Sequence, residues 1–87
     1  MTPYTNIEVT DKYIIREFNE NIDPIELMWH RDLNSRKITV LEGKGWFYQQ
    51  EDQLPQQLNP GDQIFIPALE WHRIIKGNTN LKLQIEE

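Results

Sequence analysis

The stretch MWHRDLNSRKITVLEGKGWF, residues 28–47, indicates the fold class because it joins two β-type patterns through glycines. Residues 37–43 (KITVLEG) are rich in the β-branched side chains of a central strand, and residues 46–50 (WFYQQ) begin with three aromatic residues. The segment between them, Gly43 to Gly45, is typical of a tight turn. We therefore predict that the two segments form a β-hairpin.

The rest of the chain also favours strands over helices. Apolar residues alternate most clearly in residues 81–85 (LKLQI), and no stretch has apolar residues at helical spacing. Further strands are expected at residues 13–18, 25–30, 56–62, 63–67 and 71–77, with turn-forming residues between them. About eight short strands separated by frequent turns predict an all-β sandwich or barrel.

Composition limits the size of the protein and the chemistry available to it. The 87 residues suffice for one small domain, which buries roughly 60 % of its unfolded surface. With 38 % hydrophobic and 26 % charged residues, the chain is typical of soluble globular proteins. There is no cysteine, so disulfides, thiolate ligands and thiol nucleophiles are excluded. Any metal must be held by histidine, carboxylate or water.

The charge and the length of the apolar runs argue against two classes of partner, nucleic acids and membranes. A net charge of -5 and nine dispersed basic residues are opposite to what binding to a phosphate backbone requires. No apolar run approaches the length of a membrane span, and the first residues lack the pattern of a secretory signal. We expect a cytoplasmic protein with a small-molecule ligand and with no nucleic-acid or membrane partner.

Residues 61–76 (GDQIFIPALEWHRIIK) resemble the second sequence motif of the cupins, which are small jelly-roll barrels. That motif reads G, five residues, P, one residue, G, two residues, H, three residues, N. Three of its positions are matched, by Gly61, Pro67 and His72. Leu69 replaces the second glycine and Lys76 replaces the asparagine.

Residues 24–43 resemble the first cupin motif in spacing more than in residue type. That motif reads G, five residues, H, one residue, H, three or four residues, E, six residues, G. The chain places at these positions, in order, Pro24, His30, Asp32, Arg36 and Gly43. The resemblance covers roughly residues 24–85 and extends to small cupin-like proteins of bacteria and phages, so residues 1–87 are expected to form a single cupin-like domain. The resemblance implies a double-stranded β-helix whose metal, where present, is held by histidines and a glutamate of these motifs.

Strand alternation gives these residues a common direction. If His30 points into the barrel, Asp32 does too, and Arg36 shares a face with the aliphatic residues at 38 and 40. Together with His72, His30 and Asp32 make a set of two histidines and one carboxylate, which leaves coordination positions open for substrate and O₂. Such a set suits a divalent Fe, Mn, Ni or Zn ion. Arg36 would then anchor an anion, and the protein would be a metal-dependent oxygenase or isomerase of a small anionic substrate.

A metal-free pocket is the alternative. Arg36 follows Asp32 by four residues, and an ion pair between them would occupy the carboxylate and place a positive charge near the metal position. Glu42 is a second candidate partner for Arg36. The protein would then bind an anion or sugar acid without catalysis, or use His30 and His72 as metal-free acid–base catalysts. A third hypothesis, a barrel used only as an interaction scaffold, requires a pocket filled by side chains.

The remaining large side chains are expected in the core or at an interface. Met28, Tyr48 and Phe65 are candidates for the pocket wall or the core, and the core is favoured. Trp29, Trp46 and Trp71 could form a stacking platform for a sugar or base, but positions 29 and 71 precede inward histidines and should face outward. Packing under the N-terminal segment or in a subunit interface is favoured. A thin core suggests a homodimer in which the strand at 13–18 joins the partner's sheet.

Overall fold

The computed structural model describes residues 4–87 and contains two antiparallel β-sheets. Its elements, in chain order, are β1 (Thr5–Val9), β2 (Ile14–Phe18), the 3₁₀ helix η1 (Pro24–Leu27), β3 (Arg36–Glu42), β4 (Phe47–Gln50), β5 (Gln56–Gln57), β6 (Gln63–Ile66), β7 (His72–Ile75) and β8 (Leu81–Glu86).

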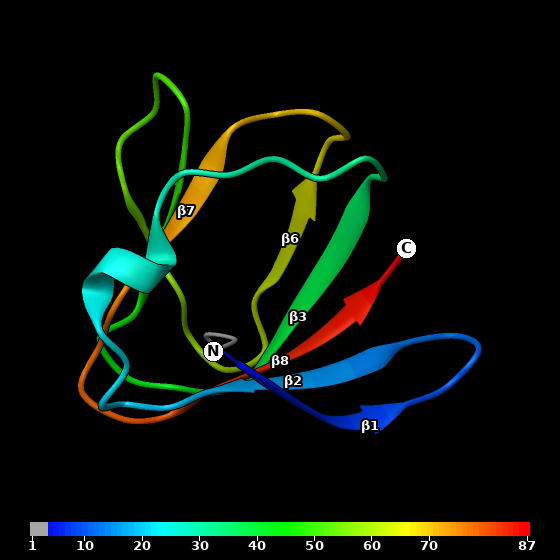
Figure 1. Cartoon of the computed structure of the whole chain (residues 1–87), viewed down its shortest axis with the longest axis horizontal. Coiled ribbons are helices and arrows are strands. Elements are labelled where there is room, and N and C mark those ends of the chain that lie inside the picture. The colour runs from blue at the N-terminus through cyan, green and yellow to red at the C-terminus, as the bar shows by residue number, and fades with distance from the viewer. Residues whose placement is uncertain (1–3) are drawn as a thin grey trace.

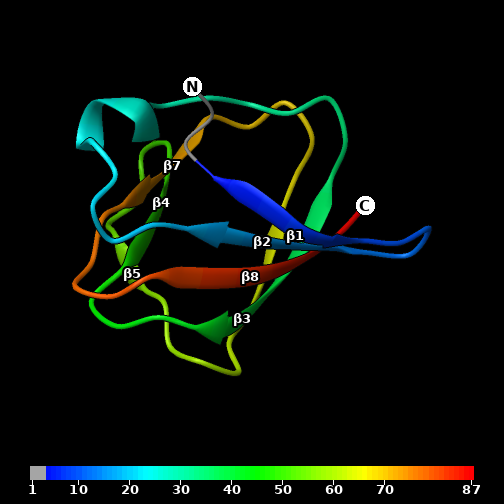
Figure 2. The same cartoon turned by 60° about the horizontal axis from the view of Figure 1, so that its bottom comes forward.

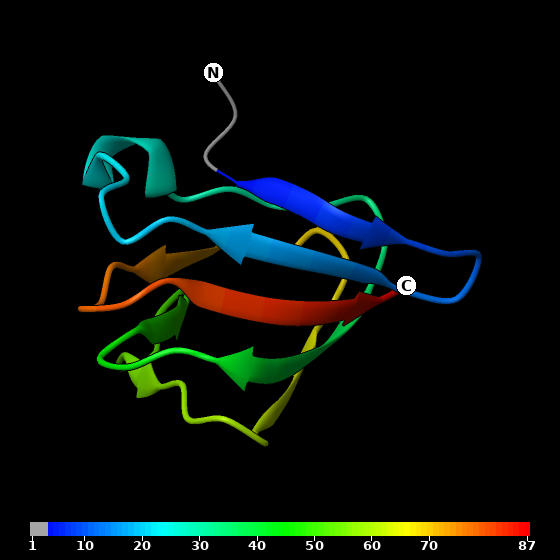
Figure 3. The same cartoon turned by 90° about the horizontal axis from the view of Figure 1, so that it is seen from below.

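The two sheets face each other. The larger has the strand order β1-β2-β8-β3-β6, and the smaller has the order β5-β4-β7. Figure 1 shows β7 opposite β3 and β8, with the chain after η1 passing over one end of the barrel to reach β3. Figures 2 and 3 show β1, β2, β8 and β3 lying side by side. The predicted all-β jelly-roll architecture is confirmed.

The predicted hairpin at residues 37–50 is wrong. β3 pairs with β6 and β8, whereas β4 pairs with β5 and β7, so the two strands belong to different sheets. The glycine segment instead carries the chain around a corner of the barrel, and Gly45 adopts a φ of 78° there. The local pattern was that of two strands and a turn, but nothing in it specified which edges would pair.

The predicted strand at 25–30 is also wrong. Its first part is the helix η1, which Pro24 begins and Asp23 caps by accepting a hydrogen bond from the N–H of Ile25 over 3.0 Å. An aspartate followed by proline is a helix-start signal, and here it outweighs the apolar content of the segment. Leu27 is the buried residue of the helix, and only His30 forms a β-bridge.

Residues 56–62 were expected to form a short strand that ends in a Pro-Gly turn, and the structure has the strand Gln56–Gln57 followed by a turn at Pro60 and Gly61. In this turn Asp62 accepts a hydrogen bond from the N–H of Asn59.

The strand β1 was not predicted, although Ile7 and Val9 alternate with the polar residues Asn6 and Glu8, and all five of its residues are exposed. The other predicted strands are present, with ends shifted by one or two residues.

β2 cannot extend a partner's sheet as predicted. It lies between β1 and β8 and is hydrogen-bonded to both, so neither of its edges is free. The edge strand on this side is β1. A homodimer stays a prediction, but the strand at 13–18 is not the means of forming it. Among residues 4–87, no helix is long and apolar enough to cross a membrane.

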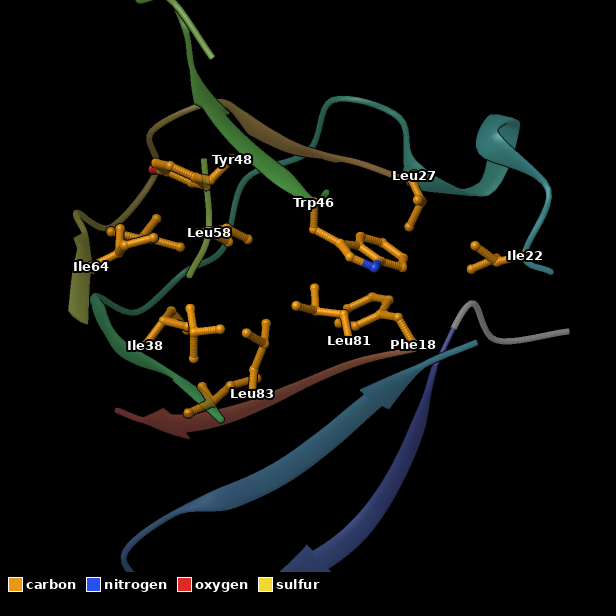
Figure 4. Close-up of a cluster of buried hydrophobic side chains, with 13 residues drawn as sticks. Phe18, Ile22, Leu27, Ile38, Trp46, Tyr48, Leu58, Ile64, Leu81 and Leu83 are labelled. Carbon is orange, nitrogen blue, oxygen red and sulfur yellow. The ribbon is translucent and has the colours of Figure 1, made fainter. Parts of the chain in front are cut away.

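The core lies between the two sheets and is densest at the end closed by Trp46 (Figure 4). Trp46 is fully buried, packs against Phe18 with ring centres 6.1 Å apart, and donates its indole N–H to the carbonyl of Thr79. Aliphatic residues from alternate positions of β3, β6 and β8 complete this core. The opposite end of the barrel carries the polar residues.

Candidate metal centre

The polar residues picked out by the motifs lie together on one cavity. This cavity, of about 390 Å³, is lined by His30, Asp32, Arg36 and His72, as the sequence predicts. Aliphatic side chains from both sheets make up most of the rest of its wall. The pocket is therefore less polar than expected, with its polar groups confined to part of the wall, and it is not filled by side chains. The condition attached to the scaffold-only hypothesis is not met.

A backbone bridge holds the two histidines opposite each other. The N–H of His30 donates to the carbonyl of His72 over 3.0 Å, and the N–H of His72 donates to the carbonyl of His30 over 2.9 Å. Residues paired this way point their side chains to the same face. The two imidazole rings accordingly lie 4.3 Å apart between centres. His72 is buried, whereas the side chain of His30 is half-exposed and faces the mouth of the cavity.

Asp32 completes the set with a single oxygen. Its Oδ2 lies 3.4 Å from Nε2 of His72 and 3.9 Å from Nε2 of His30. Ligand atoms from the three residues all lie within 4.8 Å of one another. Two hydrogen bonds fix the loop that carries Asp32: Leu69 donates to its carbonyl, and the N–H of Ala68 donates to Oγ of Ser35.

The histidine tautomers follow from their other ring nitrogens. Nδ1 of His72 lies 2.9 Å from the carbonyl oxygen of Glu70, and Nδ1 of His30 lies 3.3 Å from that of Met28. A carbonyl only accepts, so Nδ1 of each neutral ring carries the proton. Each Nε2 then directs a lone pair toward the carboxylate of Asp32. This arrangement of backbone-held imidazoles is the one found in metal sites.

A proton on His72 would reduce the repulsion between the lone pairs that face one another here, but burial opposes this protonation. Burial lowers the pKa of His72 below its ordinary value, and the nearby His30 and Arg36 act in the same direction. The carbonyl of Glu70 and the carboxylate of Asp32 oppose the shift without cancelling it. His72 is therefore neutral at neutral pH.

Arg36 makes the ion pair that the alternative hypothesis predicted, but with a second partner. Nη1 of Arg36 lies 3.4 Å from Oδ2 of Asp32, and its Nε donates to the carboxylate of Glu87 over 2.9 Å. Glu87 was missed because it lies 51 positions away in the sequence, and strand pairing between β3 and β8 brings it close. Its negative charge compensates the guanidinium, which reduces the repulsion that Arg36 would exert on a metal.

The residues present fit a divalent transition metal. Oδ2 of Asp32 is buried and has no hydrogen-bond partner within residues 4–87, although three side-chain nitrogens surround it at 3.4 to 3.9 Å. An unsatisfied buried carboxylate oxygen is costly. Two imidazole nitrogens and one carboxylate oxygen within 4.8 Å of one another are donors that Fe, Mn, Ni and Zn accept.

Glu42 does not pair with Arg36 as proposed. A β-bulge between Val40 and Glu42 inserts one extra residue, which places Glu42 opposite Lys82 instead of on the inner face. Its carboxylate lies 3.5 Å from Nζ of Lys82. Counting by two along a strand fails across a bulge, and the sequence gives no sign of this one.

Of the three residues expected in the core, only Tyr48 is there. Phe65 is 65 % exposed because it alternates with the buried Ile64 and Ile66 on β6. Met28 is also mostly exposed, at the rim of the cavity. The two-residue period of β6 places the Phe65 side chain on the outer face of the sheet.

The three tryptophans do not form one platform, although Trp29 and Trp71 together line a second, outer pocket. Trp46 is in the core, whereas Trp29 and Trp71 face outward, as their positions beside the histidines predict. The guanidinium of Arg73 lies 5.0 Å from the Trp29 ring, and that of Arg31 lies 5.1 Å from the Trp71 ring. These contacts, between residues on either side of the His30–His72 bridge, cover part of each indole.

Arg16 is a cavity residue that sequence reasoning missed. It lies on β2 between Ile14 and Phe18, and all three side chains point inward. The alternation of the strand is visible in the sequence and places Arg16 on the same face as Ile14 and Phe18. Burial lowers the pKa of Arg16, while Arg36 lowers it further and Asp32 raises it, so these charges act on one another through the cavity.

Comparison with known proteins identifies the architecture. No family model and no curated protein sequence matches the chain. A cupin-2 domain protein from Shewanella frigidimarina has a similar structure, with a TM-score of 0.67 and 21 % identity over 97 % of this chain and 78 % of the other. The chain has the cupin fold.

Two other proteins with this cupin fold carry names that refer to small molecules. One, from Ralstonia eutropha, is provisionally assigned as a mannose-6-phosphate isomerase, with a TM-score of 0.67 and 18 % identity over 94 % of this chain and 79 % of that one. The other is the DMSP lyase DddQ from Ruegeria pomeroyi, with a TM-score of 0.61 and 16 % identity over 90 % of this chain. This chain spans 39 % of the lyase, and identities this low establish the fold only.

Proposed function

We propose that the protein is a metal-dependent enzyme that acts on a small anionic molecule, as an oxygenase or an isomerase. His30, Asp32 and His72 would hold a divalent Fe, Mn, Ni or Zn ion, and Arg36 would contribute positive charge for the anion. The observation that carries the proposal is the buried Oδ2 of Asp32, which faces two imidazole lone pairs and has no hydrogen bond within the described residues.

Each residue named in the proposal has its own role. A bound metal of this kind supplies Lewis acidity or, as iron, the capacity to react with O₂. His72 and Asp32 provide the buried side of the site, and His30 provides the side toward the cavity mouth. Arg36 orients Asp32, and the aliphatic wall limits the access of water. The reactions named for two proteins with the same fold are consistent with small-molecule chemistry in this cavity.

The test is metal content, measured by inductively coupled plasma mass spectrometry on tag-free protein. Near-stoichiometric metal that is lost in His72→Ala and in Asp32→Asn supports the ligand set. Glu51→Gln is the matched control because Glu51 is an exposed carboxylate on the outer side of the barrel, and it should keep the metal. Protein that stays empty in the presence of Fe(II), Mn, Ni and Zn would overturn the proposal.

The metal-free binding function has one observation in its favour. The Arg36–Asp32 ion pair, at 3.4 Å, is the feature expected of a pocket in which the guanidinium replaces a metal. In that case the protein would bind an anion or sugar acid without catalysis, or His30 and His72 would act as acid–base groups. Removing the guanidinium with Arg36→Met separates the two functions, since it should strengthen metal binding under the first and abolish anion binding under the second.

A further inference from the structure

The wall of the cavity is mostly aliphatic, which restricts what can fill it. Both sheets contribute, with Ile38, Ile64, Ile66, Ile74, Leu83 and Ile85 among the lining residues. A volume of about 390 Å³ is at the lower end of ligand pockets and holds on the order of ten non-hydrogen atoms. A polyhydroxylated ligand would leave most of its hydroxyl groups against these side chains without partners. The wall therefore favours an apolar group.

Arg16 supplies a positive charge on the same cavity. It is half-buried, its Nε donates to Oδ1 of Asn6 over 2.9 Å, and its guanidinium carbon lies 3.7 Å from the centre of the Tyr4 ring. Whereas Arg36 has two carboxylate partners, Arg16 has no carboxylate within 4.0 Å among the described residues. A cation that loses part of its hydration without an ion pair favours an anionic ligand.

The hydroxyl of Tyr48 is a second polar group available to a ligand. Tyr48 is 6 % exposed and lines the cavity, and its hydroxyl has no hydrogen-bond partner within residues 4–87. Burial raises the pKa of Tyr48, with Glu70 acting in the same direction, so the hydroxyl keeps its proton. It can therefore donate to a ligand oxygen.

The charges of the cavity wall also favour an anion once a metal is present. The charged residues that line it are Arg16, Arg36, Glu26 and Asp32, two of each sign. A divalent cation held by His30, Asp32 and His72 would make the cavity positive. A ligand carrying a carboxylate would offset part of this positive charge.

We propose that the cavity binds a carboxylic acid with an unbranched or lightly branched apolar chain of about four to eight carbons, whose chain lies against the aliphatic wall and whose carboxylate is held on the Arg16 side. The Tyr48 hydroxyl donates a hydrogen bond to the bound molecule. That such an acid is the substrate rests on the function proposed above, whereas its binding does not.

The first experiment is calorimetric titration of the full chain with butanoate, hexanoate, octanoate and decanoate, with octanol and gluconate as comparisons. Metal content is recorded on the same sample. The affinity should rise about fourfold for each added methylene until the cavity is full, and then level off. Octanoate should bind at least tenfold more tightly than octanol.

Variants locate the two ends of the ligand. Arg16→Met keeps the side-chain bulk and should lower octanoate affinity roughly tenfold while leaving octanol affinity unchanged. Tyr48→Phe should lower octanoate affinity roughly fivefold. Ile64→Phe narrows the cavity and should shorten the chain length at which affinity levels off. Phe65→Ile is the matched control, since it changes the next residue of β6 on the exposed face and should change nothing.

Two results would overturn the inference: affinity that does not depend on chain length, or gluconate binding as tightly as octanoate. Acid binding and metal content are measured separately, so either proposal can fail alone. Metal-loaded protein that ignores these acids would leave the enzyme proposal in place and remove this one. Metal-free protein that binds octanoate in the expected manner would support this inference and remove the enzyme proposal.

Discussion

The N–H of Leu69 donates a 2.7 Å hydrogen bond to the carbonyl of Asp32, and Leu69 adopts a left-handed conformation with φ of 64° while doing so. Most side chains avoid this region because their Cβ crowds the backbone. Leu69 stands where the cupin motif has its second glycine. The chain thus keeps the backbone shape that the motif glycine allows, at a cost in strain. This shape ties the loop of the second motif to the backbone carbonyl of Asp32 in the first motif.

Leu69→Gly should therefore stabilise the protein. Relief of the left-handed strain exceeds the added entropy of the unfolded chain, for a net gain of about 0.5 to 1 kcal/mol in the free energy of unfolding. Chemical denaturation measures it. Asp52→Gly is the control, because Asp52 has a φ of 63° but belongs to a residue type that tolerates it, so its gain should be smaller. Equal gains at both positions would contradict this account.

Tyr48→Phe should stabilise the ligand-free protein by about 1 kcal/mol. The substitution removes a buried hydroxyl that has no partner in the described residues and leaves the packing of the ring intact. Tyr13→Phe provides the contrast, since the Tyr13 hydroxyl is on the surface and bonds to Glu8. Thermal unfolding compares the two variants, and a loss of stability in Tyr48→Phe would indicate a hydrogen bond that the described residues do not supply.

Gly77→Ala should be strongly destabilising, by about 2 to 4 kcal/mol. A Cβ at this position would lie 2.4 Å from Cδ1 of Trp46 and 2.5 Å from the carbonyl oxygen of Lys44, where neither the buried indole nor the backbone can move aside. Gly61→Ala separates this clash from backbone strain, because Gly61 has a φ of 93° with nothing within 4 Å of its would-be Cβ. It should cost about 1 kcal/mol. Urea denaturation gives both values.

The metal-free protein should lose stability as the pH falls below about 6.5. Burial lowers the pKa of His72 in the folded state, so the unfolded chain takes up a proton first. The free energy of unfolding therefore falls with pH from the unfolded pKa to the lower folded value and is level below that. His72→Gln should flatten this segment of the profile. A profile unchanged by the substitution would mean that another group titrates there.

Glu87→Gln should weaken metal binding roughly two- to fivefold, more at low salt than at high salt. Glu87 compensates Arg36 at 2.9 Å, and without it the guanidinium repels a cation at the His30–Asp32–His72 set. Glu42→Gln removes a carboxylate whose partner is Lys82 and should leave metal affinity unchanged. Competition with a fluorescent chelator measures both. Tighter metal binding in Glu87→Gln would exclude this role.

The features that could be predicted from the sequence were those that depend on regular residue spacing, along a strand or within a motif. The alternation at 81–85 and the positions of His30, Asp32, Arg36 and His72 led to a jelly roll with these four side chains on one cavity, which the structure confirms. Pairing was not predictable in the same way, because β3 and β4 look like a hairpin locally and their partners are chosen by the whole barrel.

The errors arose where another physical signal outweighed the pattern. The cap at Asp23 with Pro24 made a helix out of an apolar run, and a bulge turned Glu42 outward. In β1 the alternation of Ile7 and Val9 was short and was not recognised as a strand. Glu87 and Arg16 reach the site through strand neighbours far away in the sequence. The alternation of β2 gives the face of Arg16, but its closeness to the site, like that of Glu87, follows only from the order of strands around β8.

The exposed strand β1 has a consequence for how copies of the protein behave at high concentration. An edge strand offers a row of unpaired backbone groups on which another chain could be added, and this is a route to fibrous aggregates. The pairing of β1 with β2 is irregular between Asn6 and Glu8, which breaks the evenness of that row, and Glu8 places a negative charge beside it. Replacing Glu8 with a β-branched apolar residue would remove the charge from this edge and shorten the time before the protein aggregates.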